Sequence, residues 1–240
     1  MNPPHIGLGI GIYTRTDAGR LLGLTPRRLG RWVRGYTYWL RSGAEPRRTS
    51  KPPIVRTDLP RVGGALSLSF LELMELRVVR GFVQKGVPLQ RVRVAARRIA
   101  SLFKTTHPFA HRRLFTDRQQ IFVDLADMDA QPGLLQVTGR KASLQVIAGG
   151  LLKGYVEEMD FDAQTSLAER WFPLGRSMPI VLDPRIAFGA PVLLGTRIRT
   201  DVLSAYVSGN REPSVAKAFD LRIDQVRAAV AFEAHLAQAA

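Results

Sequence analysis

The segment 14–35 contains signals for two short helices with a tight turn between them, and this pattern constrains the fold more than any other feature of the chain. In the first helix, apolar side chains recur at helical spacing after Thr14 or Thr16, either of which can cap the first turn. The second helix is predicted to begin after Thr25, another N-cap candidate, and to end at Gly35. Two helices joined in this way are typical of a helix-turn-helix, whose second helix enters the DNA major groove.

Arginine covers one side of the second predicted helix. Leu29, Trp32 and Val33 lie at the spacing of an apolar face, and four arginines occupy the other side. An ordinary amphipathic helix with a solvated basic face would show the same pattern, but the coincidence of helix, turn, arginine and tryptophan favours DNA recognition. The side chains predicted to contact DNA here are Thr14, Thr25, Arg27, Arg28, Arg31 and Arg34.

The distribution of charge supports a polyanionic partner for one half of the chain. The net charge is +15, but residues 1–120 carry 23 basic and 6 acidic side chains, a net of +17, whereas residues 121–240 carry 12 and 14, a net of −2. An arginine-rich genome could raise the total, but it would not confine the excess to the first half. Arginine also suits bidentate contacts to phosphate and guanine. The first half is therefore predicted to bind nucleic acid.

Residues 36–64 are rich in Gly, Pro, Arg and Ser and contain a short extended run, Pro53–Arg56. This composition is typical of a wing or β-hairpin that lies along the phosphate backbone, and a disordered basic loop is the alternative. Contacts to phosphate would add affinity without sequence information. The side chains predicted to make them are Arg47, Arg48, Lys51 and Arg56.

The remaining patterns predict a mainly helical α+β chain. Helices are expected over 66–82 and 88–105. In the second of these, we expect Val92, Val94, Ala95, Ile99 and Leu102 to point inward and Arg91, Arg93, Arg97 and Arg98 to point outward. A middle region follows, and we interpret it as a candidate dimerisation surface. It is predicted to contain strands over 114–116 and 121–125, a helix over 142–152 and extended pieces near 151–161 and 170–173.

The last segment begins with an extended run at 180–186 and short strand-and-turn units, which three predicted helices follow at 200–207, 213–219 and 223–236. The last two helices again form a helix-turn-helix, but their charge is balanced, so contact with protein is favoured over contact with DNA. An ion pair between Asp183 and Arg197 is a further hypothesis. The predicted organisation is a winged helix-turn-helix domain (1–106), an α+β middle region (107–178) and a C-terminal helix-turn-helix-like domain (179–240).

Few residues are arranged for catalysis or metal binding. The chain has no cysteine, which removes thiolate ligands, disulfides and a cysteine nucleophile. His107 and His111 lack an obvious third ligand, and the acidic residues of 157–162 are interpreted as a solvated cluster. No signal peptide or long apolar run is recognisable, so we expect a cytoplasmic protein. From the scarcity of catalytic and metal-binding arrangements, we expect that it is not an enzyme and uses no cofactor or metal.

Residues 13–35 resemble the helix-turn-helix of the MerR-like superfamily, which begins with a Tyr-Thr pair and ends with Arg-Trp and Gly. The resemblance covers about 25 residues and implies a DNA-binding first domain. The positions that carry it are Tyr13, Thr14, Ala18, Leu22, Gly23, Leu24, Arg28, Arg31, Trp32 and Gly35.

The C-terminal stretch resembles the domain of unknown function 433, and the combined architecture is similar to long antitoxins of the VapB type. That resemblance implies that the C-terminal half binds a PIN-domain (VapC-type) ribonuclease toxin, while the N-terminal half, as a homodimer, binds operator DNA and represses the operon. Which residues would contact the toxin is left open. The matching positions are Ile180, Asp183, Pro184, Ile186, Gly189, Pro191, Val192, Gly195, Thr196, Arg197, Ile198, Gly209 and Ala228.

Two other functions remain open from the residues alone. A stand-alone MerR-like regulator could sense a small organic molecule with its second half, and it would also bind a palindromic operator as a dimer. A nucleic-acid-processing enzyme could use the acidic cluster at 157–162, which would require a divalent metal. A tight protein partner, a stabilising ligand and metal-dependent turnover distinguish these three functions.

Overall fold

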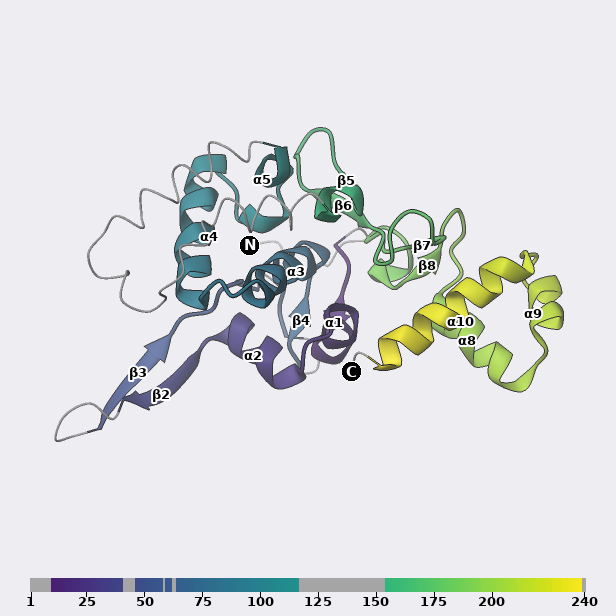
Figure 1. The fold of residues 1–240 in the computed structure, drawn as a ribbon, viewed down its shortest axis with the longest axis horizontal. Helices are drawn as coiled ribbons and strands as arrows, with labels where there is room; N and C mark the ends of the chain where they lie inside the picture. Colours follow the sequence, from purple (N-terminus) through teal and green to yellow (C-terminus); the bar gives the residue numbers. More distant parts are fainter. Residues whose placement is uncertain (1–9, 41–45, 58, 62–63, 117–153, 239–240) are drawn as a thin grey trace.

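The computed structural model describes residues 10–40, 46–57, 59–61, 64–116 and 154–238. Figure 1 shows an extended arrangement, with a β-hairpin projecting at one end, helices α1 to α5 in the centre and a second group of helices, α8 to α10, at the other end. The strands described form four small antiparallel sheets of two strands each. The predicted mainly helical α+β class, with an N-terminal helix-turn-helix, is confirmed.

Helices α1 (Arg15–Leu22) and α2 (Pro26–Arg34) are the two helices predicted from the capping signals. Thr14 caps α1 in a capping box with Asp17, and Gly23 ends that helix in the left-handed conformation. The Thr25 side chain accepts a hydrogen bond from the backbone N–H of Arg28. A proline at the start of α2 loses nothing by lacking its N–H, because that group has no partner within a helix.

The predicted wing is a β-hairpin of strands β2 (Tyr36–Leu40) and β3 (Arg47–Lys51). A disordered loop is therefore the wrong interpretation for these residues. The extended run Pro53–Arg56 is not one of its strands, because Pro52 and Pro53 have no N–H to donate to a ladder. Instead, the N–H of Ile54 donates to the carbonyl of Trp32 at 2.7 Å, which returns the chain to α2.

The central core lies around α3 (Phe70–Gln84), which buries most of its length. Ser69 caps it in a capping box with Glu72, and the short strand β4 (Ser67–Leu68) before it pairs with β1 (Tyr13–Thr14). Helix α4 (Leu89–Phe103) and the 3-10 turn η1 (Pro108–Ala110) cover α3. The helix-turn-helix therefore rests on α3 through both packing and a backbone ladder.

Two predicted directions on α4 are wrong. Arg93 is only 7% exposed, whereas Leu102 is 44% exposed. The reason is tertiary: the buried face of α4 is rotated relative to its apolar stripe, so that the Arg93 guanidinium reaches the carbonyl of Pro52, at 3.1 Å from its Nε, near the base of the wing. Arg97 and Arg98 are exposed, as predicted.

The middle region departs most from the expectation. Residues 113–116 are a helical turn, α5 (Arg113–Thr116), instead of a strand, because the N–H groups of Leu114 and Phe115 bond to carbonyls three residues earlier. Three residues are too few for periodicity to separate strand from helix. The extended pieces appear as β5 (Met159–Phe161) paired with β6 (Ala168–Trp171). The predicted strand at 121–125 and helix at 142–152 lie outside the described residues.

The same hydrophobic core includes parts of the predicted first and middle regions. Phe109, Leu114, Phe115, Met159 and Trp171 belong to the cluster built on α1 to α4. Arg77 of α3 adds an ion pair and a cation–π contact to this packing. It pairs with Glu158, and its guanidinium carbon lies 3.7 Å from the centre of the Tyr155 ring. The boundaries at 106/107 and 178/179 remain predictions.

The C-terminal unit has its own apolar core. Strand β7 (Ile180–Val181) pairs with β8 (Val192–Leu193), with the turn η3 (Ala187–Gly189) between them. Helices α8 (Thr200–Gly209), α9 (Glu212–Ala218) and α10 (Ile223–Gln238) follow, close to the predicted ranges. Their buried side chains gather around Leu203, Val226 and Phe232. Within the described ranges, no helix is long and apolar enough to cross a membrane.

Candidate nucleic-acid interface

Helix α2 presents all four predicted arginines to solvent. Arg27, Arg28, Arg31 and Arg34 are exposed. Leu29, Trp32 and Val33 on the opposite side are at most 4% exposed and anchor the helix in the core. No acidic residue interrupts the arginines along Pro26–Arg34. The helix can therefore meet a polyanion without burying an opposing carboxylate.

Two of these arginines are held against aromatic rings. The guanidinium carbon of Arg28 lies 5.2 Å from the centre of the Trp32 ring, and that of Arg31 lies 4.0 Å from the centre of the Tyr36 ring. Stacking restrains a guanidinium while leaving the donors on its edge free for a base or a phosphate. Arg28 and Arg31 are thus better ordered for base recognition than a freely rotating side chain.

An open depression of about 510 Å³ lies over this part of α2. The structure brings four of the predicted DNA-contacting residues together around it, with two aromatic rings and the start of α4. Its lining residues are Thr25, Arg27, Arg28, Arg31, Trp32, Tyr36 and Leu89. A basic hollow at the beginning of a helix has the charge to accept the nucleic-acid backbone or a base edge.

The wing extends the basic surface beyond α2. Arg47, Arg48 and Arg56 are exposed and Lys51 is half-buried. The base of the hairpin is closely packed: Gly35 has a φ of +73°, and a Cβ there would overlap the Lys51 carbonyl. The base of the wing is therefore packed directly against the end of α2.

Thr14 and Tyr13 both have hydrogen-bond partners within the folded chain. The Thr14 hydroxyl donates to the Asp17 carboxylate at 2.6 Å, so it belongs to a cap, and its predicted contact with DNA stays a prediction. The buried Tyr13 hydroxyl donates to the Gly189 carbonyl at 2.8 Å. Burial first, and then the nearby Asp183 carboxylate, raises the pKa of Tyr13, which keeps the phenol a neutral donor.

Helix α1 also contacts the C-terminal unit through side chains. Arg20 lies 3.4 Å from the Glu233 carboxylate of α10, and the same carboxylate accepts a hydrogen bond from Thr200 at 2.6 Å. Leu21 packs against the apolar clusters of both units. The first helix of the DNA-binding motif is thus attached to the second half of the chain.

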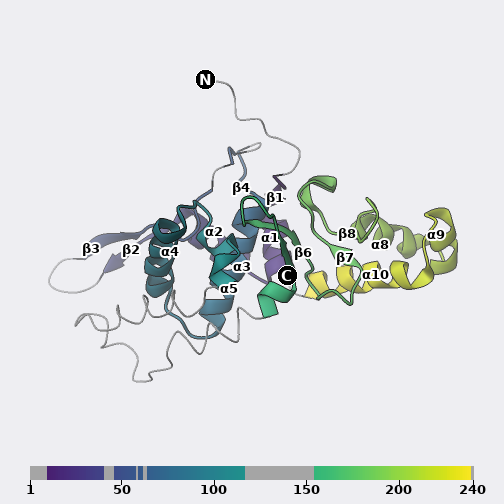
Figure 2. The same ribbon diagram turned by 90° about the horizontal axis from the view of Figure 1, so that it is seen from above.

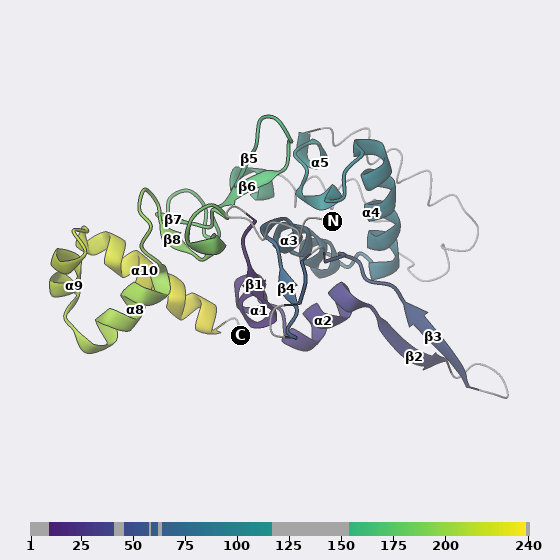
Figure 3. The same ribbon diagram turned by 180° about the vertical axis from the view of Figure 1, so that it is seen from behind.

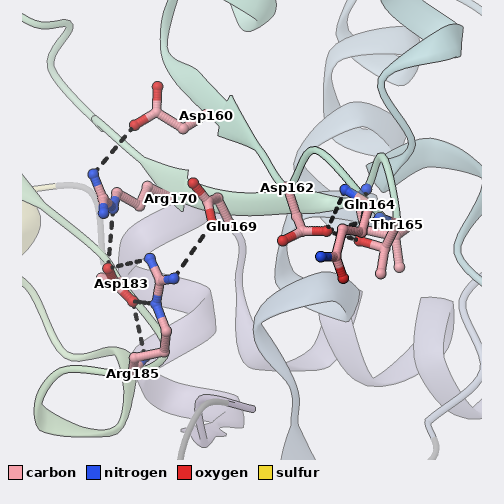
Figure 4. A network of polar contacts seen from close by, with 9 residues as sticks. Asp160, Asp162, Gln164, Thr165, Glu169, Arg170, Asp183 and Arg185 are labelled. Atoms are coloured by element: carbon pink, nitrogen blue, oxygen red, sulfur yellow. Dashed lines mark hydrogen bonds and ion pairs between the residues drawn. The ribbon is translucent and has the colours of Figure 1, made fainter.

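The acidic cluster of 157–162 forms ion pairs and turns instead of a metal site. Asp160 pairs with Arg176 at 2.6 Å and Arg170 at 3.8 Å. Asp162 accepts hydrogen bonds from Thr165 and Gln164, which lower its pKa (Figure 4). Among the residues that the structure describes, no group of three or more His, Cys, Asp or Glu side chains could hold a metal ion.

Asp183 pairs differently from the prediction. It is 3% exposed and bonds to Arg185 at 2.9 Å and Arg170 at 3.0 Å (Figure 4), whereas Arg197 is exposed. The predicted Asp183–Arg197 pair is wrong, because the β6 strand places Arg170 beside the turn after β7. His107 Nδ1 lies 3.2 Å from the Glu75 carboxylate, whereas His111 Nδ1 accepts a hydrogen bond from the backbone N–H of Arg113 at 3.2 Å.

Two family models match the chain. Residues 11–96 match the family described as "Putative DNA-binding HTH domain", and residues 180–232 match "Protein of unknown function (DUF433)". Both predicted resemblances are confirmed. The first match contains α1, α2, the wing and α3, and so includes both helices of the helix-turn-helix.

Similar proteins span nearly the whole chain. The protein named "Putative antitoxin VapB45" of Mycobacterium tuberculosis is 28% identical over 92% of this chain and 93% of its own length. The "Uncharacterized protein Rv2308" of the same organism is 23% identical over 91% and 88%. A crystal structure of Rv2018 from Mycobacterium tuberculosis has a TM-score of 0.67 at 25% identity and covers 91% of this chain and 96% of that one.

Proposed function

We propose that this protein is an antitoxin that represses its own operon through the helix-turn-helix and neutralises a PIN-domain ribonuclease toxin of the VapC type. The observation that carries the DNA-binding part is the row of four exposed arginines on α2, with the basic wing beside it. As a homodimer, the protein would bind two half-sites of a palindromic operator. The proposal contains no catalytic step and needs no cofactor.

The similarity to a protein named as an antitoxin supports the second part of the proposal, since the alignment includes both halves of the chain. The C-terminal unit lies away from the wing and α2 (Figure 3), so a partner bound there would leave the basic surface open. That unit also exposes large apolar side chains, which suit contact with protein. They are Phe188, Leu194, Val202 and Tyr206.

Co-expression with the protein encoded next to this chain tests the toxin partnership. We expect a stoichiometric complex in which a protein that is toxic alone becomes harmless. The control is the same neighbour co-expressed with a variant of this chain, Val202→Glu with Tyr206→Glu, in which the exposed apolar surface of the C-terminal unit is substituted. If nothing is retained and a small molecule instead raises the melting temperature, the regulator that senses a ligand is the better function.

Single substitutions on α2 test DNA binding. We expect Arg28→Ala and Arg31→Ala each to weaken binding to a duplex from the protein's own promoter by about 1–3 kcal/mol, because each stacked guanidinium is placed to contact a base edge. Fluorescence anisotropy of labelled DNA measures the change. The matched control is Arg211→Ala, an exposed arginine of the C-terminal unit. Equal affinities for all four proteins would refute the assignment of α2 as the recognition helix.

A further inference from the structure

The end of the wing exposes two large apolar side chains. Trp39 is 63% exposed and Leu40 is 39% exposed. The other two tryptophans, Trp32 and Trp171, are 2% and 4% exposed. An indole left in water forgoes the stabilisation that burial provides, so its exposure at the end of a projecting hairpin indicates a partner that covers it.

The charges around these side chains identify the kind of partner. In the register of the hairpin, Trp39 lies opposite Arg48 and Leu40 lies opposite Arg47. Successive residues of a strand face opposite sides, so each side of the hairpin carries one apolar and one cationic side chain near its end. Residues 36–51 contain four basic and one acidic side chain. A second copy of this basic segment would bring like charges together, whereas a nucleic acid offers both phosphates and apolar base faces.

The position of the hairpin relative to α2 is compatible with both elements contacting one duplex. Strand β2 begins at Tyr36, directly after Gly35 ends α2, and the Arg31–Tyr36 stack joins them. Figure 2 shows the hairpin projecting outward from the helices beside α2. Five strand residues span about 17 Å, which is roughly half of the 34 Å helical turn that separates a major groove from the next one. The end of the wing can thus reach the minor groove adjacent to the major groove that α2 occupies.

We infer that Trp39 is a wedge that enters the minor groove of double-stranded DNA and stacks against a partly opened base step, with Arg47 and Arg48 on the flanking phosphates. This inference rests on the proposed DNA binding and adds a site that bends the duplex. Apolar side chains inserted in this way unstack a base step and kink DNA toward the major groove. The energy lost in unstacking is recovered from the contacts that the bend permits.

Tryptophan fluorescence provides a direct test, because Trp39 is the one exposed indole among the three in the chain. The full-length protein is titrated with a duplex of about 30 base pairs from its own promoter, with acrylamide as quencher. We expect DNA to quench part of the Trp39 emission. The Trp39 emission that remains should be protected from acrylamide. Heparin, a polyanion without bases, should do neither. In Trp39→Phe, acrylamide should quench the two remaining tryptophans only weakly, with or without DNA, because Trp32 and Trp171 are buried.

A second measurement follows affinity and bending. We expect Trp39→Ala to weaken duplex binding by about 5- to 150-fold, the range for loss of one aromatic–base stack. The bend, measured by energy transfer between dyes at the two duplex ends, should disappear, and Trp39→Phe should retain part of it. The matched control is Phe188→Ala, which removes an aromatic ring of similar exposure, 61%, from the C-terminal unit.

Several outcomes would overturn the wedge. If wild-type protein binds the duplex but Trp39 stays accessible to acrylamide, the wing does not insert, and the proposed function is unaffected. Equal protection by heparin would show that any bound polyanion covers the indole and that bases are not needed. Protection that rises with protein concentration without DNA would assign Trp39 to contact between copies. If no duplex binds at all, the proposed repressor function fails together with the wedge.

Discussion

At the scale of single residues, two motifs that are far apart in sequence meet in the structure. Tyr13 belongs to the helix-turn-helix motif and Gly189 to the C-terminal motif, and their hydrogen bond at 2.8 Å is buried. A backbone bond from Ile12 to the Phe188 carbonyl at 2.9 Å lies beside it. Gly189 has a φ of +84°, and a Cβ there would overlap the Tyr13 hydroxyl. Each motif thus contains a residue that the other one needs.

Substitution of Gly189 tests this contact. We expect Gly195→Ala, at a φ of +81° with open space around it, to lower the free energy of unfolding by about 1–2 kcal/mol through backbone strain alone. Gly189→Ala adds the overlap with a buried ring, so its loss should be larger by about 1–3 kcal/mol. Urea denaturation measures both. Equal losses would mean that the Tyr13 ring moves aside without cost.

Asp183 provides a pH dependence with a defined sign. Burial alone would raise its pKa, but hydrogen bonds from Arg185 and Arg170 outweigh that effect and lower the pKa below 3.8. A carboxylate with a lowered folded-state pKa stabilises the protein above its ordinary pKa and loses this contribution as the pH falls through the folded value.

We therefore expect Asp183→Asn to lower the free energy of unfolding at pH 7 by about 1–3 kcal/mol and to reduce the loss of stability between pH 5 and pH 3. Urea denaturation across this range gives the comparison. Asp224→Asn, which removes an exposed pair with Arg222, is the control and should have a smaller effect, because water screens it. An unchanged acid profile in Asp183→Asn would rule out this ion-pair network as a source of acid sensitivity.

At the scale of elements, capping signals predicted the helices better than composition predicted the strands. Thr14 and Thr25 each cap a helix as the sequence indicates, since a cap depends on neighbouring residues only. The strands of the wing were not located, and the turn at 113–116 was predicted as a strand. Strands need partners distant in sequence, and such short segments contain no periodicity to reveal them.

Helix α2 should depend on its cap for both stability and DNA binding. We expect Thr25→Ala to cost about 1 kcal/mol of stability, because the Arg28 N–H loses its acceptor. The same change loosens the turn that carries Arg27 and Arg28, so DNA affinity should also fall. Thr25→Ser keeps a hydroxyl acceptor and should retain both properties. If Thr25→Ala behaves like Thr25→Ser in urea denaturation and DNA-binding assays, the cap contributes nothing measurable.

At the scale of the whole molecule, the charge is divided between two surfaces that one helix connects. The basic residues lie on α2, the wing and α4, while α1 joins this body to the C-terminal unit through Arg20 and Glu233. Helix α1 therefore contacts both α2 and the C-terminal unit. The division of charge was visible in the sequence, but the contact between the two halves was not.

The basic surface should make DNA binding strongly dependent on salt. Each phosphate neutralised contributes about −0.9 to the slope of log K against log salt, so we expect a slope of about −4 or steeper for the α2 and wing arginines together. Arg47→Ala with Arg48→Ala should reduce the magnitude of the slope by about 2. Anisotropy titrations from low to high salt measure it. A slope that these substitutions do not change would remove the wing from the DNA interface.

The sequence by itself determined the helix-turn-helix, the arginine face of α2 and the two family resemblances, because caps, helical periodicity and local motifs depend on residues close together in the chain. Only the tertiary structure decided which arginines are stacked, where Asp183 finds its partners, how Tyr13 meets Gly189 and that Trp39 remains exposed. The contacts among those features join residues 2 to 176 positions apart, and only the packing of the folded chain brings the distant ones together.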